Sequence, residues 1–157
     1  TPPSPKPTTL PSPKPTTPPS PKPTTPPSPK PTEAFHFQIK IAVNKNLCIQ
    51  ASKQKLILSP CDENNLLQSW FVDDTGRIHN YEKNHLCIKR KKTNALLTKC
   101  GTSTAFNLDY SLFFKKIFLM SKSSIVLGVI GSNARSGSKI KFTKRDTSDD
   151  LQSWDII

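Results

Sequence analysis

Apolar and polar residues alternate over short stretches of this chain from residue 35 onward. The stretch FHFQIKI, residues 35–41, places an apolar side chain at every second position. A period of two is typical of a β-strand with one buried face. Similar apolar runs recur at short spacing, and no stretch carries the i, i+3, i+4, i+7 pattern of an amphipathic helix. The twelve strands that this pattern predicts lie near residues 35–43, 47–51, 55–59, 69–73, 77–81, 85–90, 95–99, 107–111, 116–120, 124–129, 139–143 and 153–157.

A sequence repeat organises these strands. The tetrapeptide LQSW occurs at residues 67–70 and again at residues 151–154. Internal repetition at a fixed period indicates a repeat architecture. Aligned on its cysteines, the chain divides into three units of about 42 residues, which contain NLCIQA, HLCIKR and SIVLGV in turn. Four strands in each of three units predict a closed all-β fold, the β-trefoil.

The three units differ in the residues that they carry. The first unit has two cysteines and a QxW motif, whose tryptophan follows the second cysteine by nine residues. The same count from Cys100 reaches Asp109, so the second unit is predicted to lack the QxW motif. The third unit has the motif, but Val126 and Arg145 stand where the first unit has its cysteines. The two LQSW copies therefore mark the first and third units.

Four cysteines lie in the repeated part of the chain: Cys48, Cys61, Cys87 and Cys100. The interval from Cys48 to Cys61 equals the interval from Cys87 to Cys100. Zinc sites place cysteines only two to four residues apart, and neither pair fits. Two matched loops favour the disulfides Cys48–Cys61 and Cys87–Cys100, and with them an oxidising compartment. Each bond would close a loop of about 14 residues and stabilise the fold by ~3 kcal/mol.

Residues 1–32 differ in composition from the rest. They form four copies of an eight-residue unit of the type TPPSPKPT and hold 15 of the 16 prolines. Because the repeats have almost no apolar side chains, they cannot form a core, and proline favours an extended polyproline II conformation. We predict a stiff Pro/Thr/Ser/Lys-rich stalk over residues 1–32, either O-glycosylated or undecorated. The globular domain is predicted over residues 33–157.

The chain starts within a repeat and without a methionine. We therefore expect a mature piece, or a segment of a longer protein. No apolar run reaches the length of roughly 18 residues that a membrane-spanning helix needs. No part of this chain is therefore expected to insert into a membrane, although a longer parent could be tethered to one.

The repeated motifs resemble those of a known family. The segments NLCIQA, CDENNLLQSWFV, HLCIKR and LQSWDII are similar to those of ricin-B-type β-trefoil lectins, and most similar to the cysteine-rich domain of mannose-receptor-type endocytic receptors. The resemblance covers residues 35–157 and implies a glycan-binding module without catalysis. It also implies that the QxW tryptophan fills the core and that the glutamine bonds the backbone. These structural residues are Gln68, Trp70, Gln152 and Trp154.

The resemblance also bears on the position of a sugar site. Galactose-binding members of the ricin-B family carry an acidic residue two places after the first cysteine and a polar residue before the QxW glutamine. The matching residues here are Gln50, Lys89 and Gly128 for the first position, and Leu67, Phe106 and Leu151 for the second. We therefore do not expect the usual galactose site in any unit.

Mannose-receptor-type domains recognise sulfated sugars through their third unit, which implies a candidate site in the third unit of this chain. The candidate residues are Ser132, Asn133 and Arg135. Their loop is about six residues longer than its counterpart in the first unit, because the interval from Val126 to Arg145 exceeds that from Cys48 to Cys61 by this amount. The sugar-stacking aromatic residue of that family is not reproduced.

Positive charge indicates a second candidate site. The chain has a formal net charge of +12, and residues 77–116 hold nine basic and two acidic residues. The basic residues are densest at Lys89, Arg90, Lys91 and Lys92. A sulfated glycan fits this charge in an extracellular setting, and the alternative is a solvated loop without a ligand. Nucleic acid is not expected, because no aromatic residue interleaves the basic cluster.

Catalysis, cofactors and metal ions are not expected. The cysteines are predicted to be paired, and no glycine-rich phosphate loop or cluster of histidines occurs. We therefore expect a secreted or cell-surface β-trefoil that binds glycans or glycoproteins, with sulfated glycans as candidate ligands. The alternatives are a protein-interaction or structural module of a cell-surface receptor that has lost sugar binding, and a targeting module tethered to an enzyme. The sequence does not indicate an oligomeric state.

Overall fold

The computed structural model describes residues 1–4 and 35–157. The chain divides into two compact parts, Thr1–Thr32 and Glu33–Ile157. The predicted stalk lies outside the described residues, apart from its first four. Among the described residues, every strand lies in the second part, Glu33–Ile157. None of the helices in this part of the chain is long and apolar enough to cross a bilayer.

Twelve strands form the domain, and each strand end lies within two residues of its predicted position. The strands are β1 (Phe37–Ile41), β2 (Leu47–Ser52), β3 (Lys55–Pro60), β4 (Ser69–Val72), β5 (Ile78–Asn80), β6 (Leu86–Lys91), β7 (Asn94–Lys99), β8 (Leu108–Ser111), β9 (Lys116–Leu119), β10 (Lys122–Val129), β11 (Ile140–Lys144) and β12 (Trp154–Ile156). A short 3₁₀ helix that the periodicity did not predict precedes the last strand of each unit: η1 (Leu66–Gln68), η2 (Thr104–Phe106) and η3 (Asp150–Gln152). The predicted all-β trefoil is confirmed.

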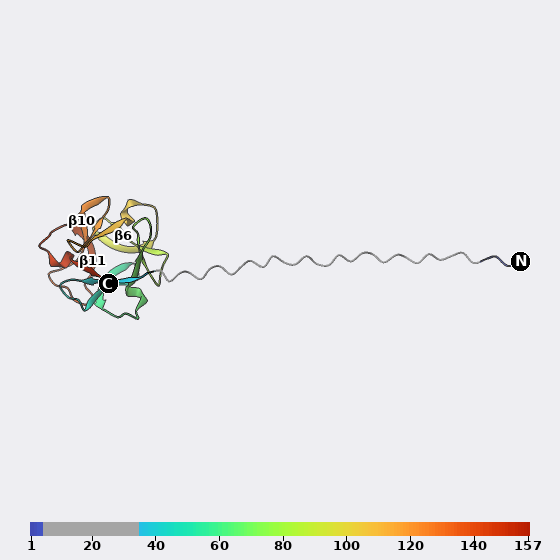
Figure 1. Cartoon of the computed structure of the whole chain (residues 1–157), viewed down its shortest axis with the longest axis horizontal. Coiled ribbons are helices and arrows are strands. Elements are labelled where there is room, and N and C mark those ends of the chain that lie inside the picture. Colours follow the sequence, from blue (N-terminus) through green and yellow to red (C-terminus); the bar gives the residue numbers. More distant parts are fainter. Residues whose placement is uncertain (5–34) are drawn as a thin grey trace. The chain divides into compact units, whose positions relative to one another are not determined.

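The strands close into a barrel with pseudo-threefold symmetry. β12 pairs with β1, with Ile39 opposite Ile156, and so joins the end of the third unit to the start of the first. Six strands form the three hairpins β2–β3, β6–β7 and β10–β11, and β7 pairs with both β3 and β11. The three units follow one another around a common centre, coloured from cyan and green through yellow to red in Figure 1. Equivalent positions in the three hairpins can therefore be compared directly.

The two QxW tryptophans lie in the core. The indoles of Trp70 and Trp154 are fully buried. Each indole Nε1 donates to a backbone carbonyl on the first hairpin strand of its own unit, that of Ile49 at 3.1 Å and that of Leu127 at 3.0 Å. A buried indole is stable only when its N–H has an acceptor. These bonds fix the last strand of each unit against its hairpin.

The two QxW glutamines hold the loop that precedes the tryptophan. Gln68 accepts a hydrogen bond from the amide of Asp62 at 2.9 Å and donates to the carbonyl of Pro60 at 2.8 Å. Gln152 accepts from the amide of Asp146 at 2.9 Å in the same way. Both side chains are buried, so their role in this fold is to satisfy backbone groups of the loop.

The second unit departs from the predicted alignment by one residue. The helices η1 and η3 end on the QxW glutamines, whereas η2 ends on Phe106. The buried Leu108 therefore occupies the tryptophan position. The prediction that Asp109 stands there is wrong, and Ala105, not Phe106, precedes the glutamine position.

A shorter loop explains this shift. Cys100 is followed by Gly101, and a Cβ atom on that glycine would lie only 3.2 Å from Cε2 of Phe106. The phenyl ring thus fills the space that a glutamine and a longer loop occupy in the other units. A residue count along the sequence cannot detect such a deletion, because Phe106 itself replaces the residue that would mark the motif.

The structure confirms both predicted disulfides. Cys48–Cys61 and Cys87–Cys100 have S–S distances of 2.08 and 2.02 Å. In each bonded pair the Cα atoms lie 5.0 Å apart, within the range that a disulfide spans. Two of the three hairpins are therefore covalently closed.

Hydrogen bonds alone hold the corresponding place in the third unit. Val126 pairs across the hairpin with Thr143, two residues before Arg145, as Cys48 pairs with the residue two before Cys61. The amide of Arg145 donates to the carbonyl of Ser124 at 2.8 Å, as the amide of Cys61 does to Asn46 at 2.9 Å. Val126 and Arg145 therefore take the two cysteine positions, as the sequence alignment predicts.

One carboxylate fixes the turn between β4 and β5. Oδ2 of Asp73 accepts from Nε of Arg77 at 2.6 Å and lies 2.8 Å from Nε2 of His79. Oδ1 accepts from the hydroxyl of Thr75 at 2.8 Å. Burial raises the pKa of Asp73, but the hydrogen bonds from His79, Thr75 and Arg77 outweigh this effect and hold the pKa well below its usual range.

Replacement of Trp70 or Trp154 with alanine should lower the free energy of unfolding by ~3–5 kcal/mol, because each substitution empties a packed interior. Unfolding in urea or by heat measures this loss. The control Val72→Ala, at a half-exposed position on the same strand as Trp70, should change stability by less than ~0.5 kcal/mol. A tryptophan variant of unchanged stability would show that the indole is not part of the core.

Replacement of Asp73 with asparagine should destabilise the domain at neutral pH by ~1.5–3 kcal/mol, because a charged hydrogen-bond acceptor is lost. Since the pKa of Asp73 is lower in the folded than in the unfolded chain, its contribution is present above the ordinary value of 3.8 and is lost as the pH falls below it. Unfolding at pH 6 and pH 2 should show the difference from wild type shrink in acid. The exposed neighbour supplies the control Asp74→Asn, and an Asp73→Asn deficit of equal size at both pH values would contradict the prediction.

Candidate functional site

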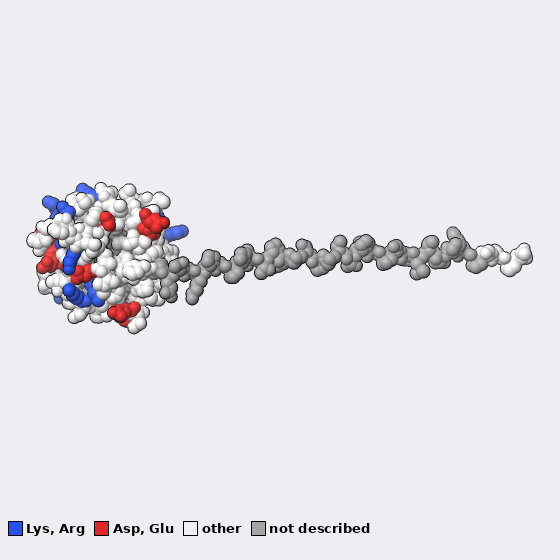
Figure 2. Space-filling view, viewed as in Figure 1, with Lys and Arg blue, Asp and Glu red and all other residues white. Residues whose placement is uncertain are grey.

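The predicted basic cluster does not form one exposed patch. Lys89 and Arg90 are half-buried on β6, whereas Lys91 at the end of β6 and Lys92 in the turn that follows are exposed. The ammonium of Lys89 lies 4.8 Å above the centre of the Phe106 ring, a cation–π contact. Basic and acidic side chains are interspersed on the face of the domain that Figure 2 shows. Only Lys91 and Lys92 are free to meet a ligand at this turn.

The third unit has an open hollow at the loop between β10 and β11. Its volume is about 510 Å³. Val129 pairs with Ile140 at the base of this loop, where Ala51 pairs with Leu56 in the first unit. The additional residues of the third unit therefore all fall in this loop. The residues that line the hollow are Ile130, Gly131, Ser132, Asn133, Arg135, Ser136, Gly137, Ser138 and Lys139.

Hydrogen bonds give this loop a defined shape. The amide of Ser138 donates to the carbonyl of Arg135 at 3.0 Å, and the hydroxyl of Ser138 accepts from the amide of Arg135 at 3.3 Å. Gly137 has a φ of 83°, which favours glycine, and its amide donates to the carbonyl of Leu58 on β3 at 2.8 Å. The loop is thus anchored on the hairpin of the first unit.

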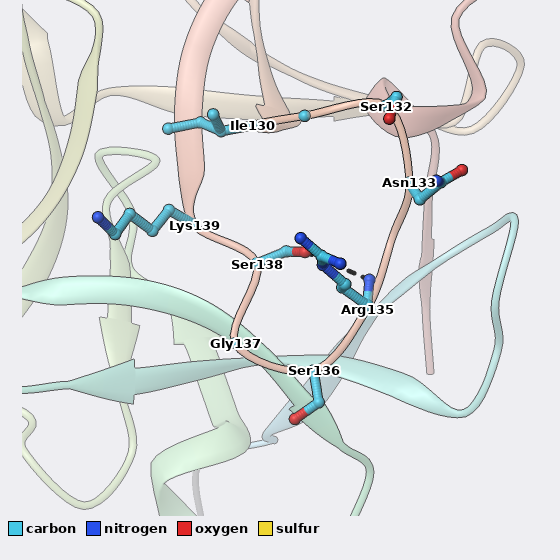
Figure 3. Close-up of a pocket in the computed structure, with 9 residues that line it drawn as sticks. Ile130, Ser132, Asn133, Arg135, Ser136, Gly137, Ser138 and Lys139 are labelled. Atoms are coloured by element: carbon cyan, nitrogen blue, oxygen red, sulfur yellow. Dashed lines mark hydrogen bonds between the residues drawn. The ribbon is translucent and has the colours of Figure 1, made fainter.

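Arg135 is the central charged group of the hollow. Figure 3 shows its guanidinium between the two limbs of the loop, beside Ser138, while the side chain of Asn133 points away. The described residues place no carboxylate within ion-pair distance of this guanidinium. Ser132 and Ser136 add two hydroxyls to the lining. The hollow thus offers two cations, Arg135 and Lys139, and several hydroxyls, with neither a carboxylate nor an aromatic ring among its lining residues.

The three galactose positions are filled or blocked. Oε1 of Gln50 accepts a hydrogen bond from Nε2 of Gln68 at 3.1 Å, so this amide is engaged within its own unit. Lys89 at the second position covers the aromatic ring below it. A Cβ atom on Gly128 at the third would lie 3.1 Å from Cγ of Gln152. A carboxylate that could accept bonds from galactose is therefore missing at all three positions.

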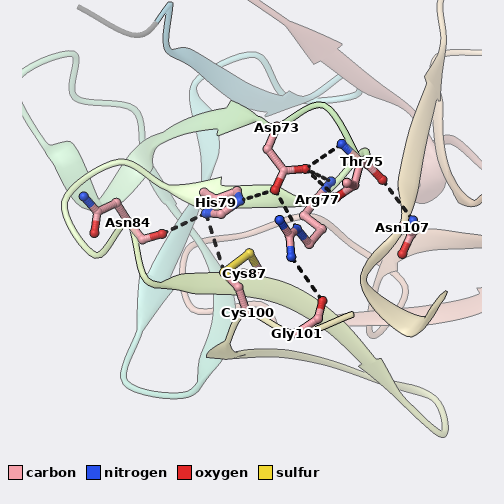
Figure 4. A network of polar contacts seen from close by, with 9 residues as sticks. All are labelled: Asp73, Thr75, Arg77, His79, Asn84, Cys87, Cys100, Gly101 and Asn107. Carbon is pink, nitrogen blue, oxygen red and sulfur yellow. Dashed lines mark hydrogen bonds and ion pairs between the residues drawn. A yellow bond between two sulfur atoms is a disulfide. The ribbon is translucent and has the colours of Figure 1, made fainter. Parts of the chain in front are cut away.

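A histidine lies against the disulfide of the second unit, as Figure 4 shows. Nδ1 of His79 lies 3.5 Å from Sγ of Cys100 and 2.8 Å from the carbonyl oxygen of Asn84. Three possible metal-ligand atoms, from His79, Cys87 and Cys100, lie within 4.8 Å of one another. The two sulfurs are bonded to each other, so they cannot serve as thiolate ligands. With Asp73 at its second nitrogen, His79 links the β4–β5 turn to the disulfide of this unit.

A second hollow, which no sequence motif marks, lies beside the β8–β9 hairpin. Its volume is about 350 Å³, and Asp109, Phe114, Phe118 and Arg145 are among its lining residues. Two indirect signals are present in the sequence. One is the loss of the cysteine pair in the third unit, and the other is the apolar run at residues 112–114 in a predicted turn.

Comparison with known proteins identifies the family and the fold. The family model described as ricin-type beta-trefoil lectin domain matches residues 35–154. The C-half of the earthworm R-type lectin, solved in complex with GalNAc, is similar with a TM-score of 0.69 and 20% sequence identity, over 77% of this chain and 96% of that chain. The Vibrio vulnificus hemolysin/cytolysin β-trefoil lectin, solved with N-acetyl-D-lactosamine bound, gives a TM-score of 0.64 at 14% identity, over 80% and 95% of the two chains.

The agglutinin from Abrus precatorius has a TM-score of 0.69 and 18% identity over 81% of this chain, but only 48% of its own chain is covered. No curated protein matches the chain in sequence. At these identities the solved structures establish the fold, and the family model, which spans nearly the whole domain, establishes the family. The chain belongs to the family of ricin-type β-trefoil lectin domains.

Proposed function

We propose that this domain binds glycans without catalysing a reaction on them, through the hollow of the β10–β11 loop. Its lectin family and the sugar complexes of the earthworm and Vibrio lectins support this function. The position of Arg135 carries the choice of site. Its guanidinium lies inside the hollow beside the hydroxyl of Ser138, and no carboxylate of the described residues neutralises it.

The chemistry of the hollow favours an anionic glycan, such as a sulfated one. A guanidinium donates two parallel N–H bonds to a sulfate or a carboxylate, which gives both strength and orientation. The hydroxyls of Ser132, Ser136 and Ser138 can each donate to and accept from sugar hydroxyls. Lys139 at the end of the loop adds a second positive charge. The usual galactose site of the family has no counterpart here, and the proposed binding of an anionic glycan uses none of its residues.

We assign a different role to the β6–β7 turn. Lys91 and Lys92 are exposed, but neither of them lines any of the hollows in the described part of the chain. Exposed charges of this kind raise the rate of encounter with a polyanion more than they fix its orientation. The two lysines would therefore attract an anionic glycan that Arg135 then binds.

The two disulfides support a secreted or cell-surface location, because such bonds form and persist in oxidising compartments. The second candidate function is a protein-interaction module of a cell-surface receptor. The observation that favours it is the exposed apolar turn of the β8–β9 hairpin, where Leu112 and Phe113 are 82% and 87% exposed. Exposed apolar patches commonly mark protein contacts.

The expected ligand can be identified on an array of sulfated and neutral glycans and then titrated at low and high salt. Arg135→Ala should weaken binding of an anionic glycan by about tenfold or more at both salt concentrations, because a charged hydrogen-bond donor is lost. The matched control is the double variant Lys91→Gln with Lys92→Asn. Asparagine tolerates the φ of 58° at this position. This control should weaken binding mainly at low salt, since salt screens exposed charges.

The alternatives give different results in the same titrations. Binding that survives Arg135→Ala but disappears in the lysine variant would place the site at the β6–β7 turn. The absence of binding to every glycan at both salt concentrations would reject the proposed function and leave the protein-interaction module.

A further inference from the structure

The three units use one equivalent place in three different ways. This place lies where the strand before each hairpin pairs with the first cysteine position. The residues paired there are Lys40 with Cys48, His79 with Cys87, and Phe118 with Val126. The first two units thus have a disulfide at this place, and the third has an aromatic ring without a disulfide.

In the second unit the place is filled. The ring of His79 lies against the disulfide (Figure 4), and the ring of Phe71 stacks on it with centroids 4.6 Å apart. In the third unit Arg145 replaces the second cysteine, and its guanidinium lies 5.7 Å from the centre of the Phe114 ring. Phe118 and Arg145 therefore line an open hollow of about 350 Å³.

The hollow combines an apolar wall with a polar rim. Tyr110, Phe114 and Phe118 form the aromatic part of the lining, and Ser111 and Ser123 supply hydroxyls. The carboxylate of Asp109 accepts the amide of Tyr110 through Oδ1 at 2.7 Å, and within the described residues Oδ2 has no hydrogen-bond donor. Asp109 and the guanidinium of Arg145 form no ion pair with each other in this part of the chain.

Lys116 also lines the hollow, but its side chain is buried, and the carboxylates of Asp146, Asp149 and Asp150 near its ammonium group offset its charge. Its Nζ donates to the carbonyl of Asp149 at 2.9 Å and to the hydroxyl of Ser153 at 3.0 Å. The charges that a ligand would meet are therefore one carboxylate and one guanidinium. An anion would meet the like charge of the carboxylate, and a cation would meet that of the guanidinium. An uncharged polyol, by contrast, can donate hydrogen bonds to the carboxylate and accept them from the guanidinium.

We infer that this hollow is a second saccharide subsite, which binds an uncharged pyranose. A pyranose has an apolar C–H face, which can pack on Phe114 and Phe118, and a rim of hydroxyls for Asp109, Arg145 and the serines. Sites for small ligands are mostly apolar with a few convergent polar groups, and their volumes run from ~300 to 1,000 Å³. A hollow at the lower end of this range favours one or two sugar rings. The inference goes beyond the anionic-glycan site at Arg135 and does not depend on it.

The test is a titration of the labelled domain with the methyl glycosides of galactose, N-acetylgalactosamine, glucose and mannose, followed by amide ¹H–¹⁵N NMR. We expect at least one sugar to shift the amides of residues 109–118 and of Ser123. Phe114→Ser and Asp109→Asn should each weaken this binding by about tenfold or more. The matched control is Phe113→Ser, at a more exposed position of the same turn that does not line the hollow, and it should change affinity by less than about twofold.

Three outcomes would overturn the inference: no shift in this region with any of the four sugars, an equal loss of binding in Phe113→Ser, or a loss of these shifts in Arg135→Ala. The NMR spectrum of each variant also reports whether the domain is folded. A sulfated sugar that shifts residues 130–139 reports on the site at Arg135. The failure of one site is therefore distinguishable from the failure of the other.

Discussion

A buried indole N–H needs an acceptor, and in two of the three units it finds one in the backbone of the first hairpin strand. This bond ties the barrel strand that carries the tryptophan to the hairpin of the same unit. The adjacent glutamine then holds the connecting loop by its backbone groups. The buried hairpin positions and the glutamine and tryptophan of the QxW motif define the fold. The solvent-facing hairpin positions can therefore vary without loss of the fold. The candidate binding surfaces lie on that outer layer.

The pseudo-threefold symmetry preserves roles more than residues. Gln38, Arg77 and Lys116 occupy equivalent positions, each two residues before the residue that pairs with the first cysteine position. All three donate a hydrogen bond to the loop after the hairpin: Gln38 to the carbonyl of Asp62 at 2.9 Å, Arg77 to that of Gly101 at 3.4 Å, and Lys116 to that of Asp149 at 2.9 Å. An amide, a guanidinium and an ammonium thus perform one task. This tolerance explains how three units of low mutual similarity form one closed barrel.

The strands could be predicted from the sequence because a period of two records which face of each strand is buried. The 3₁₀ helices could not, since three residues are too few to show a period. In the second unit, Leu108 takes the place of the tryptophan. The sequence does not reveal this position, because the loop before Leu108 is one residue shorter and Phe106 replaces the glutamine of the QxW motif.

The site residues show the same division. The loop of Ser132, Asn133 and Arg135 could be chosen from its extra length and from the family resemblance, but the outward direction of Asn133 depends on the hydrogen bonds within the loop. The hollow at Asp109, Phe118 and Arg145 could not be predicted. Its residues come from different strands and turns, and only the closed barrel brings them together.

The hollow at Arg135 lies in the third unit, the one without a disulfide, and the hollow at Phe118 and Arg145 lies between this unit and the last strand of the second. A disulfide acts mainly by constraining the unfolded chain, so reduction of Cys48–Cys61 and Cys87–Cys100 would lower the stability of the domain by ~3 kcal/mol each. It would break no covalent bond in the hairpin that carries Arg135 or in the wall formed by Phe118. The redox state of the surroundings therefore changes the stability of the domain. While the chain remains folded, neither ligand-facing surface contains a bond that reduction would break.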